Sequence, residues 1–293
     1  MERLDKLLSL HNICSRRQAA ALTRAGQVRL NGVAVRRADI HVDTARDTLE
    51  VNGKPLLLQQ HLYIMMHKPA GVLSASRDPH GKTVVDLLPP ELQRRGLFPA
   101  GRLDKDTEGL LILTDDGDFA HRMLAPKKHV AKWYEARLDL PVTPQDADAF
   151  ARGLELEGLH CLPALLQALP PCGDGTPRAR VAVREGKFHQ VKRMFLSVGK
   201  QVLYLKRIKI GLLELDPALC PGECRLLQES ELETIFLPDP LAEALTILLF
   251  PAAHLLLFLL KITEFFWILS DLPKLGPENL DRKHLVMSRT NLL

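Results

Sequence analysis

A single carboxylate in an unusual setting is the first candidate for chemistry in this sequence. Asp104 lies within Gly101–Leu111, between a glycine that favours a turn and the purely apolar run Leu110–Leu113. Such a run is typical of a buried strand, which would anchor the preceding loop at the edge of a core. An acid held there is partly desolvated and has fixed neighbours, which control its ionisation for nucleophilic or acid/base chemistry.

Other acids follow Asp104 closely, and solvated loop residues are the simpler interpretation of them. A glycosidase would need a second carboxylate across the scissile bond, and none of these acids stands out as that partner. His121, His129 and His189 lack metal-ligand spacing and are interpreted as residues of the surface or beside a bound substrate. The neighbouring acids are Asp106, Glu108, Asp115 and Asp116.

Two later segments combine aromatic, amide and basic side chains. Lys132–Glu135 carries Tyr134, and a tyrosine in a strand most often serves only the packing of the sheet. Glu185–Phe195 carries Gln190, Lys192 and Arg193 among other polar residues. By composition alone, such a basic cluster is a solvated helix face.

The elements that must position these residues are short strands and helices within residues 60–237. Val181 and Val183 alternate with other residues, as in a half-buried strand. The apolar residues of segment 191–198 recur at i, i+3, i+4 and i+7, which indicates a helix closing at Gly199. Mixed short strands with few helices favour an α+β fold with a largely antiparallel sheet. Further strands are expected at residues 60–66, 110–114 and 202–205, and a short helix from Asp118.

Residues 1–59 are expected to form a separate helical and hairpin unit. Ser15 and Gln18 fit a capping box, and the helix that they open should end at Gly26. Asn31-Gly32 joins two short apolar runs and is a strong hairpin signal. This unit holds ten Lys or Arg against six Asp or Glu, a net charge of +4, whereas residues 60–237 carry +1. The basic surplus suits a unit that contacts phosphate.

The composition describes an ordinary globular protein of 293 residues with 46% hydrophobic and 25% charged residues. That length predicts roughly two domains. The five cysteines are odd in number, scattered, and without a Cys-x-x-Cys pair, which suits a reducing cytoplasm rather than a disulfide framework or a zinc site. The N-terminal residues lack the apolar core of a signal peptide.

Four motifs, in order, resemble the RsuA-type family of pseudouridine synthases. Gly101–Leu110 matches its active-site signature Gly-Arg-Leu-Asp-x-x-Thr-x-Gly-Leu. Lys68–Gly71, followed by Ser74, matches its Lys-Pro-x-Gly element. Lys132–Tyr134 matches Lys-x-Tyr, and Glu185–Met194 matches Glu-Gly-x-x-x-Gln-Val-(Arg/Lys)-Arg-Met. The resemblance extends over about residues 2–236.

The N-terminal unit resembles the S4 RNA-binding domain that these enzymes carry at the same position. The order Leu-Asp-Lys, Ser-Arg-Arg and Gly-x-Val-x-Leu-Asn-Gly supports that similarity. The resemblance therefore implies an S4-like domain at 1–59, a synthase domain at 60–237 and an additional segment at 238–293. It also implies the α+β, mainly antiparallel fold of a pseudouridine synthase.

The family's site residues transfer to three positions here. Asp104 corresponds to the catalytic acid, Tyr134 to the ring that packs against the extruded base, and Lys192 to the cation beside the acid. Many family members have Arg in place of Lys192, and a lysine orients a carboxylate less rigidly than a planar guanidinium does. The implied RNA contacts are Arg16, Arg17, Arg24, Lys68, Arg102, Gln190 and Arg193.

The resemblance implies a cytoplasmic, monomeric enzyme that needs no cofactor or metal and isomerises a uridine of ribosomal RNA. The run 188–195 is nearer to enzymes acting on the small subunit, and large-subunit RNA is the alternative substrate. An S4-type RNA-binding protein without catalysis is the second hypothesis.

Segment 238–293 departs from the family pattern. Residues 245–269 are strongly apolar but contain Pro251, Lys261 and Glu264. The preferred interpretation of this segment is a helical extension that packs on the body or on a partner. A sequence produced by an altered reading frame is the second interpretation, and a membrane anchor is the third.

Overall fold

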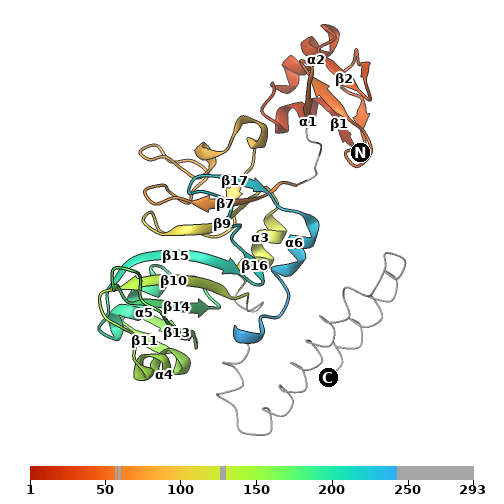
Figure 1. Cartoon of the computed structure of the whole chain (residues 1–293). Coiled ribbons are helices and arrows are strands. Elements are labelled where there is room, and N and C mark those ends of the chain that lie inside the picture. The colour runs from red at the N-terminus through yellow and green to blue at the C-terminus, as the bar shows by residue number, and fades with distance from the viewer. Residues whose placement is uncertain (57, 59–60, 126–129, 243–293) are drawn as a thin grey trace, which may run out of the picture. The chain divides into compact units, whose positions relative to one another are not determined.

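The computed structural model describes residues 1–56, 58, 61–125 and 130–242 (Figure 1). Met1–Asp239 form one compact unit. Of the expected helical extension at 238–293, residues 243–293 lie outside the described residues, as does His129. Within the described ranges, no helix is both long enough and apolar enough to cross a bilayer.

The N-terminal part is built as its sequence predicts. Ser15 Oγ accepts a hydrogen bond from the Gln18 backbone N–H at 3.3 Å, and the Ser15 N–H donates to Gln18 Oε1 at 2.9 Å. These two bonds satisfy exposed donors at the start of α2. Asn31 and Gly32 both adopt positive φ, 51° and 78°, as the hairpin requires. The elements are β1 (Glu2–Arg3), α1 (Leu4–Leu10), α2 (Arg16–Arg24), β2 (Val28–Leu30), β3 (Val33–Ala34), β4 (His41–Val42), β5 (Leu49–Val51) and β6 (Lys54–Leu56).

This part has its own sheet and its own core. The strand order is β3-β2-β5-β6, and β1 pairs separately with β4. Leu4, Leu7 and Leu8 of α1 pack against Val28 and Leu49 of the sheet in one buried cluster. Helix α2 ends at Arg24, and Gly26 follows with a φ of 72°. A small helix-and-hairpin domain of this kind needs only one apolar face on each element.

The body is organised around one nine-stranded sheet (Figure 1). Its strand order is β13-β14-β10-β15-β9-β7-β17, with β16 paired to β15 and β8 paired to β9. Of the described pairs in this sheet, only β9 with β15 is parallel. The expected α+β fold with a largely antiparallel sheet is confirmed. The strands are β7 (Tyr63–Lys68), β8 (Phe98–Pro99), β9 (Glu108–Thr114), β10 (Lys132–Leu138), β13 (Leu165–Leu169), β14 (Arg178–Val183), β15 (Val202–Ile210), β16 (Leu213–Glu214) and β17 (Cys224–Leu226).

Helices cover the two faces of this sheet with different cores. Phe150 of α4 and Phe195 of α5 belong to the larger cluster, together with Tyr134 of β10. Phe119 of α3 and Ile235, just after α6, belong to the second cluster on the opposite face. The remaining elements are η1 (Val85–Leu87), η2 (Pro90–Leu92), α3 (Gly117–Leu124), α4 (Pro144–Arg152), β11 (Leu154–Leu156), β12 (Leu159–Cys161), α5 (Gln190–Ser197) and α6 (Glu229–Thr234).

Candidate active site

The Lys68–Gly71 segment and Ser74 fix the loop that carries Asp104 through hydrogen bonds to its backbone. Ser74 Oγ donates to the Leu103 carbonyl at 2.8 Å and accepts from the Leu103 N–H at 3.0 Å. The Gly71 N–H donates to the Lys105 carbonyl at 2.7 Å. Backbone groups on both sides of Asp104 are therefore held in place, which leaves its side chain as the variable part of the loop.

Lys68 is a buried residue that binds the Asp104 loop. Its side chain is fully buried, and its Nζ donates to the carbonyls of Pro69, Lys105 and Thr107 at 3.0, 3.2 and 2.9 Å. Burial lowers the pKa of this ammonium to about 8. A direct RNA contact of Lys68 stays a prediction, and in this structure its Nζ is occupied by the three carbonyls. Lys68 thereby holds the Asp104 loop together.

Two cationic or titratable side chains of the 185–195 segment reach Asp104. Lys192 Nζ lies 3.4 Å from Asp104 Oδ2, and His189 Nε2 lies 3.6 Å from Asp104 Oδ1. The Asp104 and Lys192 side chains are 26% and 25% exposed, so the pair is accessible without being fully solvated. The predicted proximity of Asp104 and Lys192 is present in the structure. The proximity of His189 is additional, because the sequence placed it only near RNA.

Asp106 also belongs to this group. Its Oδ1 accepts a hydrogen bond from Lys192 Nζ at 2.6 Å, although its side chain is 74% exposed. The hydrogen bond from Lys192 is the main cause of a lowered pKa for the Asp106 carboxyl. Lys192 thus sits between two carboxylates and restrains the position of each.

We expect Lys192→Gln to release both carboxylates. The pKa of Asp106 should rise toward its ordinary value, because its strongest stabilising hydrogen bond is lost. The rate of any reaction at Asp104 should fall about ten- to 100-fold, the usual value of a charge-assisted hydrogen bond. Carboxyl-detected NMR titration and initial rates test the two effects. Lys105→Gln, at an exposed lysine of the same loop, is the matched control; an unchanged Asp106 pKa in Lys192→Gln would contradict the geometry.

The other acids near the loop are structural, and their interpretation as solvated loop residues is wrong. Asp115 is 8% exposed and pairs with Arg94 at 3.0 Å. Asp116 caps α3 by accepting from the Phe119 N–H at 3.0 Å. Glu108 accepts from the Tyr204 hydroxyl at 2.7 Å. Because these acids are engaged elsewhere, Asp104 stays the carboxylate available for chemistry.

The polar residues just before and at the start of α5 form a closed network. Glu185 Oε1 accepts from the Gln190 side-chain amide at 2.7 Å and from the Leu162 N–H at 2.9 Å. Gln190 Oε1 accepts from the Lys187 N–H at 3.0 Å. Gln190 is 4% exposed, and its predicted RNA contact stays a prediction. Its amide shapes the turn that carries His189. Arg193 donates to the Glu157 carbonyl, which fixes its guanidinium on the body.

A row of residues across the sheet includes one functional candidate that the sequence did not reveal. Lys68 of β7 lies opposite Gly109 of β9, and Gly109 lies opposite Arg207 of β15. Arg207 in turn lies opposite Tyr134 of β10. Its Nε donates to the Leu110 carbonyl at 2.8 Å, and its Nη1 is 3.5 Å from the Tyr134 hydroxyl. Arg207 therefore links the strand after the Asp104 loop to the strand that carries Tyr134.

Tyr134 lies against this arginine and is 8% exposed. The Arg207 guanidinium carbon is 6.0 Å from the centre of the tyrosine ring. Tyr134 shares a buried cluster with Leu103 and Val191, the neighbours of Asp104 and Lys192 in sequence. Lys132, on the same strand, is 5% exposed, and burial lowers the pKa of its ammonium to about 8.

The remaining predicted RNA contacts are on the surface. Arg16, Arg17 and Arg24 are all exposed on α2, and Arg102 is exposed on the Asp104 loop. Arg24 Nε donates to the Ala20 carbonyl at 3.0 Å, which leaves the rest of its guanidinium outward. Exposed arginines on one short helix suit phosphate contacts.

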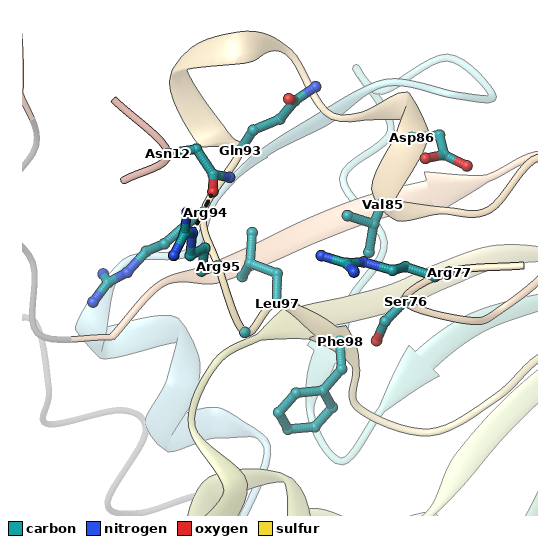
Figure 2. A pocket seen from close by; sticks show the side chains of 11 residues that line it. Asn12, Ser76, Arg77, Val85, Asp86, Gln93, Arg94, Arg95, Leu97 and Phe98 are labelled. Carbon is teal, nitrogen blue, oxygen red and sulfur yellow. Dashed lines mark hydrogen bonds between the residues drawn. The ribbon is translucent and has the colours of Figure 1, made fainter. Parts of the chain in front are cut away.

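A separate cavity has a volume of about 430 Å³. Figure 2 shows Arg77, Arg94 and Arg95 among the residues that line it. None of Asp104, Tyr134 and Lys192 lines it. Arg95 donates from its Nε to Asn12 Oδ1 at 3.1 Å, which joins the body to the chain after α1. Across the residues that the structure describes, no cluster of three or more His, Cys, Asp or Glu could hold a metal ion.

Comparison with known proteins gives this geometry its context. The sequence model of RNA pseudouridylate synthases matches residues 62–197, and that of the S4 domain matches residues 2–47. An uncharacterized RNA pseudouridine synthase of Bacillus subtilis, YtzG, is 44% identical over 237 residues, which cover 81% of this chain and 99% of the relative. This chain belongs to the RNA pseudouridine synthase family.

Further relatives define the type of synthase. The ribosomal small subunit pseudouridine synthase A of Escherichia coli is 38% identical over 237 residues, 80% of this chain and 99% of that protein. The enzyme of the same name from Vibrio cholerae is 38% identical over 236 residues, 80% of this chain and 99% of the relative. A crystal structure of a pseudouridylate synthase superimposes with a TM-score of 0.55 at 34% identity, and covers 80% of this chain and 100% of that one. This synthase is therefore of the RsuA type, with an N-terminal S4 domain, and it acts on RNA.

Proposed function

We propose that this synthase converts a uridine of small-subunit ribosomal RNA to pseudouridine, with Asp104 as its catalytic carboxylate. The observation that carries the proposal is the Asp104–Lys192 ion pair at 3.4 Å, on a loop anchored by Ser74 and Lys68. The substrate follows from the E. coli and V. cholerae relatives, whose names specify the small ribosomal subunit. Large-subunit RNA is the alternative substrate for the same site.

The reaction needs only what these residues supply. The bond between ribose C1′ and uracil N1 breaks, the base turns, and a bond forms between C1′ and C5. The C5 proton is lost and N1 gains one, so the product is an isomer and no oxidant, reductant or energy donor is consumed. Asp104 acts beside the sugar, either by attacking the substrate or by removing a ribose proton. Lys192, 3.4 Å from its carboxylate, orients Asp104 for both routes.

Tyr134 supplies the platform for the freed base in this proposal. A flat ring stabilises a nucleobase that has left its stack. Arg207 fixes the position of that ring through the Tyr134 hydroxyl and through strand β9. Because Tyr134 is 8% exposed without RNA, its ring must become more accessible when the uridine enters.

RNA is held on the outside of both parts of the chain in this proposal. Arg16, Arg17 and Arg24 of the S4 domain contact phosphates, and Arg102 contacts the backbone near the target nucleotide. Phosphate contacts fix register, while the flipped uridine and the shape of the RNA select the site. The enzyme acts as a monomer in the cytoplasm, where ribosomal subunits assemble.

A direct test is to incubate the purified protein with small-subunit and large-subunit RNA transcripts separately. Pseudouridines are then mapped as carbodiimide-dependent stops of reverse transcription. We expect one new stop in the small-subunit RNA and none in the large-subunit RNA. A stop only in the large-subunit RNA would show that the alternative substrate, large-subunit RNA, is the correct one. RNA binding without any stop would favour the S4-type binding protein over the enzyme.

We expect Arg16→Ala combined with Arg17→Ala to weaken RNA binding and to flatten its salt dependence. The slope of log K against log salt should become shallower by about 1 to 2, because each lost phosphate contact removes about one released counterion. Fluorescence anisotropy at several salt concentrations gives the slope. Arg3→Ala with Arg37→Ala is the matched control, because these exposed arginines already pair with Asp5 and Asp39. Equal slopes for both double variants would remove α2 from the RNA surface.

A further inference from the structure

Phe188 is an exposed aromatic side chain at the rim of the proposed site. Its exposed fraction is 76%, although aromatic residues are usually well buried. It belongs to neither core cluster of the described body. The turn that carries it is closed by the hydrogen bond from the Gln190 N–H to the Lys187 carbonyl at 3.1 Å. This turn presents to solvent an apolar ring that neither core cluster of the described body includes.

The ring of Phe188 stacks on His189, and His189 reaches Asp104. The two ring centroids are 3.8 Å apart with planes 19° from parallel. His189 Nε2 lies 3.6 Å from Asp104 Oδ1. His189 adopts a φ of 50°, a left-handed conformation that is uncommon for any residue other than glycine. Phe188 is therefore linked to the Asp104 carboxylate through one intervening residue, His189, which contacts both.

An aromatic ring in this position could replace the stacking partner that neighbouring bases lose when a nucleotide is extruded. When a uridine leaves a helix, its neighbours lose a stacking partner, and base flipping costs a few kcal/mol. Stacked bases repeat about every 3.4 Å along a strand, close to the spacing of the Phe188–His189 stack. Apolar side chains inserted between base steps are a known means of stabilising distorted nucleic acids.

We propose that Phe188 enters the space that the flipped uridine vacates and stacks on the neighbouring base, with His189 as the support behind it. This inference rests on the proposed function, because it needs a uridine bound at Asp104. It assigns Phe188 to RNA contact and predicts that the preferred substrate is a uridine within a stacked, paired segment. The side chain acts on extrusion of the base, whereas Asp104 acts on the chemistry that follows.

The test compares Phe188 variants on two RNAs that differ only at the target uridine. In one RNA the uridine is paired inside a helix, and in the other it faces an abasic site. Phe188→Ala should lower kcat/KM about ten- to 100-fold on the paired RNA, the range for one lost base–aromatic stack. On the RNA with the abasic site the loss should shrink to less than about threefold. Phe188→Trp should restore activity on the paired RNA.

Leu203→Ala is the matched control, because Leu203 is also an exposed apolar residue, 58% exposed, on β15. It should behave like the wild type on both RNAs. The melting temperatures of the Phe188 variants should stay near that of the wild type, since Phe188 contributes to no core cluster of the described body. Equal loss for Phe188→Ala on both RNAs, or no loss on the paired RNA, would overturn the inference.

A second measurement separates this inference from the proposed function. 2-Aminopurine next to the target uridine reports stacking by fluorescence without any need for turnover. Binding of Asp104→Asn protein should change its emission, and addition of Phe188→Ala to that variant should abolish the change. A Phe188-dependent signal with an inactive wild type would overturn the proposed function alone. Product formation without a Phe188-dependent signal would overturn the intercalation alone.

Discussion

Asp104→Asn is expected to lower the rate of pseudouridine formation at least about 10³-fold while RNA affinity stays within about threefold of the wild type. Both routes open to Asp104 require an ionised carboxylate, and an amide can neither attack the sugar nor take its proton. Losses of that size are typical when a nucleophile or a general base is removed. The amide is nearly isosteric, so the hydrogen bonds of Ser74 to the Leu103 backbone should persist.

Asp106→Asn is the control for this variant. Asp106 lies two residues away and also bonds Lys192, but its side chain is 74% exposed. Its loss should change the rate less than about tenfold, through a less restrained Lys192. Single-turnover rates and anisotropy binding curves give both quantities for each variant. If Asp104→Asn keeps a rate near the wild type, or if Asp106→Asn loses as much, the assignment of the catalytic acid is wrong.

Sequence patterns predicted the local structure well where a single interaction decides it. The Ser15–Gln18 capping box, the Asn31-Gly32 hairpin and the helix at 190–197 all follow from neighbouring residues. The antiparallel character of the sheet followed from short alternating strands. The capping box, the hairpin turn and the helix depend on contacts within a few residues, which periodicity and turn chemistry encode directly.

Roles that depend on contacts distant in the sequence could not be predicted. Lys68 lies 37 and 39 residues from the two loop carbonyls that bind it, and its basic side chain suggested RNA instead. Arg207 lies 73 residues from Tyr134 and carries no motif signal in its own segment. Gln190 has the character of a polar surface residue, and only its buried contact with Glu185 reveals its structural role. Charge type alone does not distinguish a phosphate contact from a buried strut, because only the fold supplies the partner.

Gly109 is a motif residue whose identity is explained by the packing of two strands. It follows the first residue of β9, directly after the Asp104 loop, with a φ of 107° that side chains rarely tolerate. A Cβ at this position would lie 2.1 Å from the Arg207 carbonyl oxygen and 2.7 Å from the Arg207 nitrogen. Both atoms are backbone atoms of β15, at the parallel pairing in the middle of the sheet. Only glycine allows the two strands to approach this closely, and this approach brings Arg207 against Leu110 and Tyr134.

We expect Gly109→Ala to destabilise the protein by at least about 3 kcal/mol and to abolish activity, because the strained φ and the backbone clash add together. Gly117→Ala is the control. Gly117 begins α3, a Cβ added there would meet no atom within 4 Å, and alanine should be neutral or stabilising by up to about 1 kcal/mol. Urea unfolding and single-turnover rates measure both variants. A stable, active Gly109→Ala protein would mean that β9 and β15 can separate without disturbing Asp104, and the positioning of the loop by this strand pair would then be wrong.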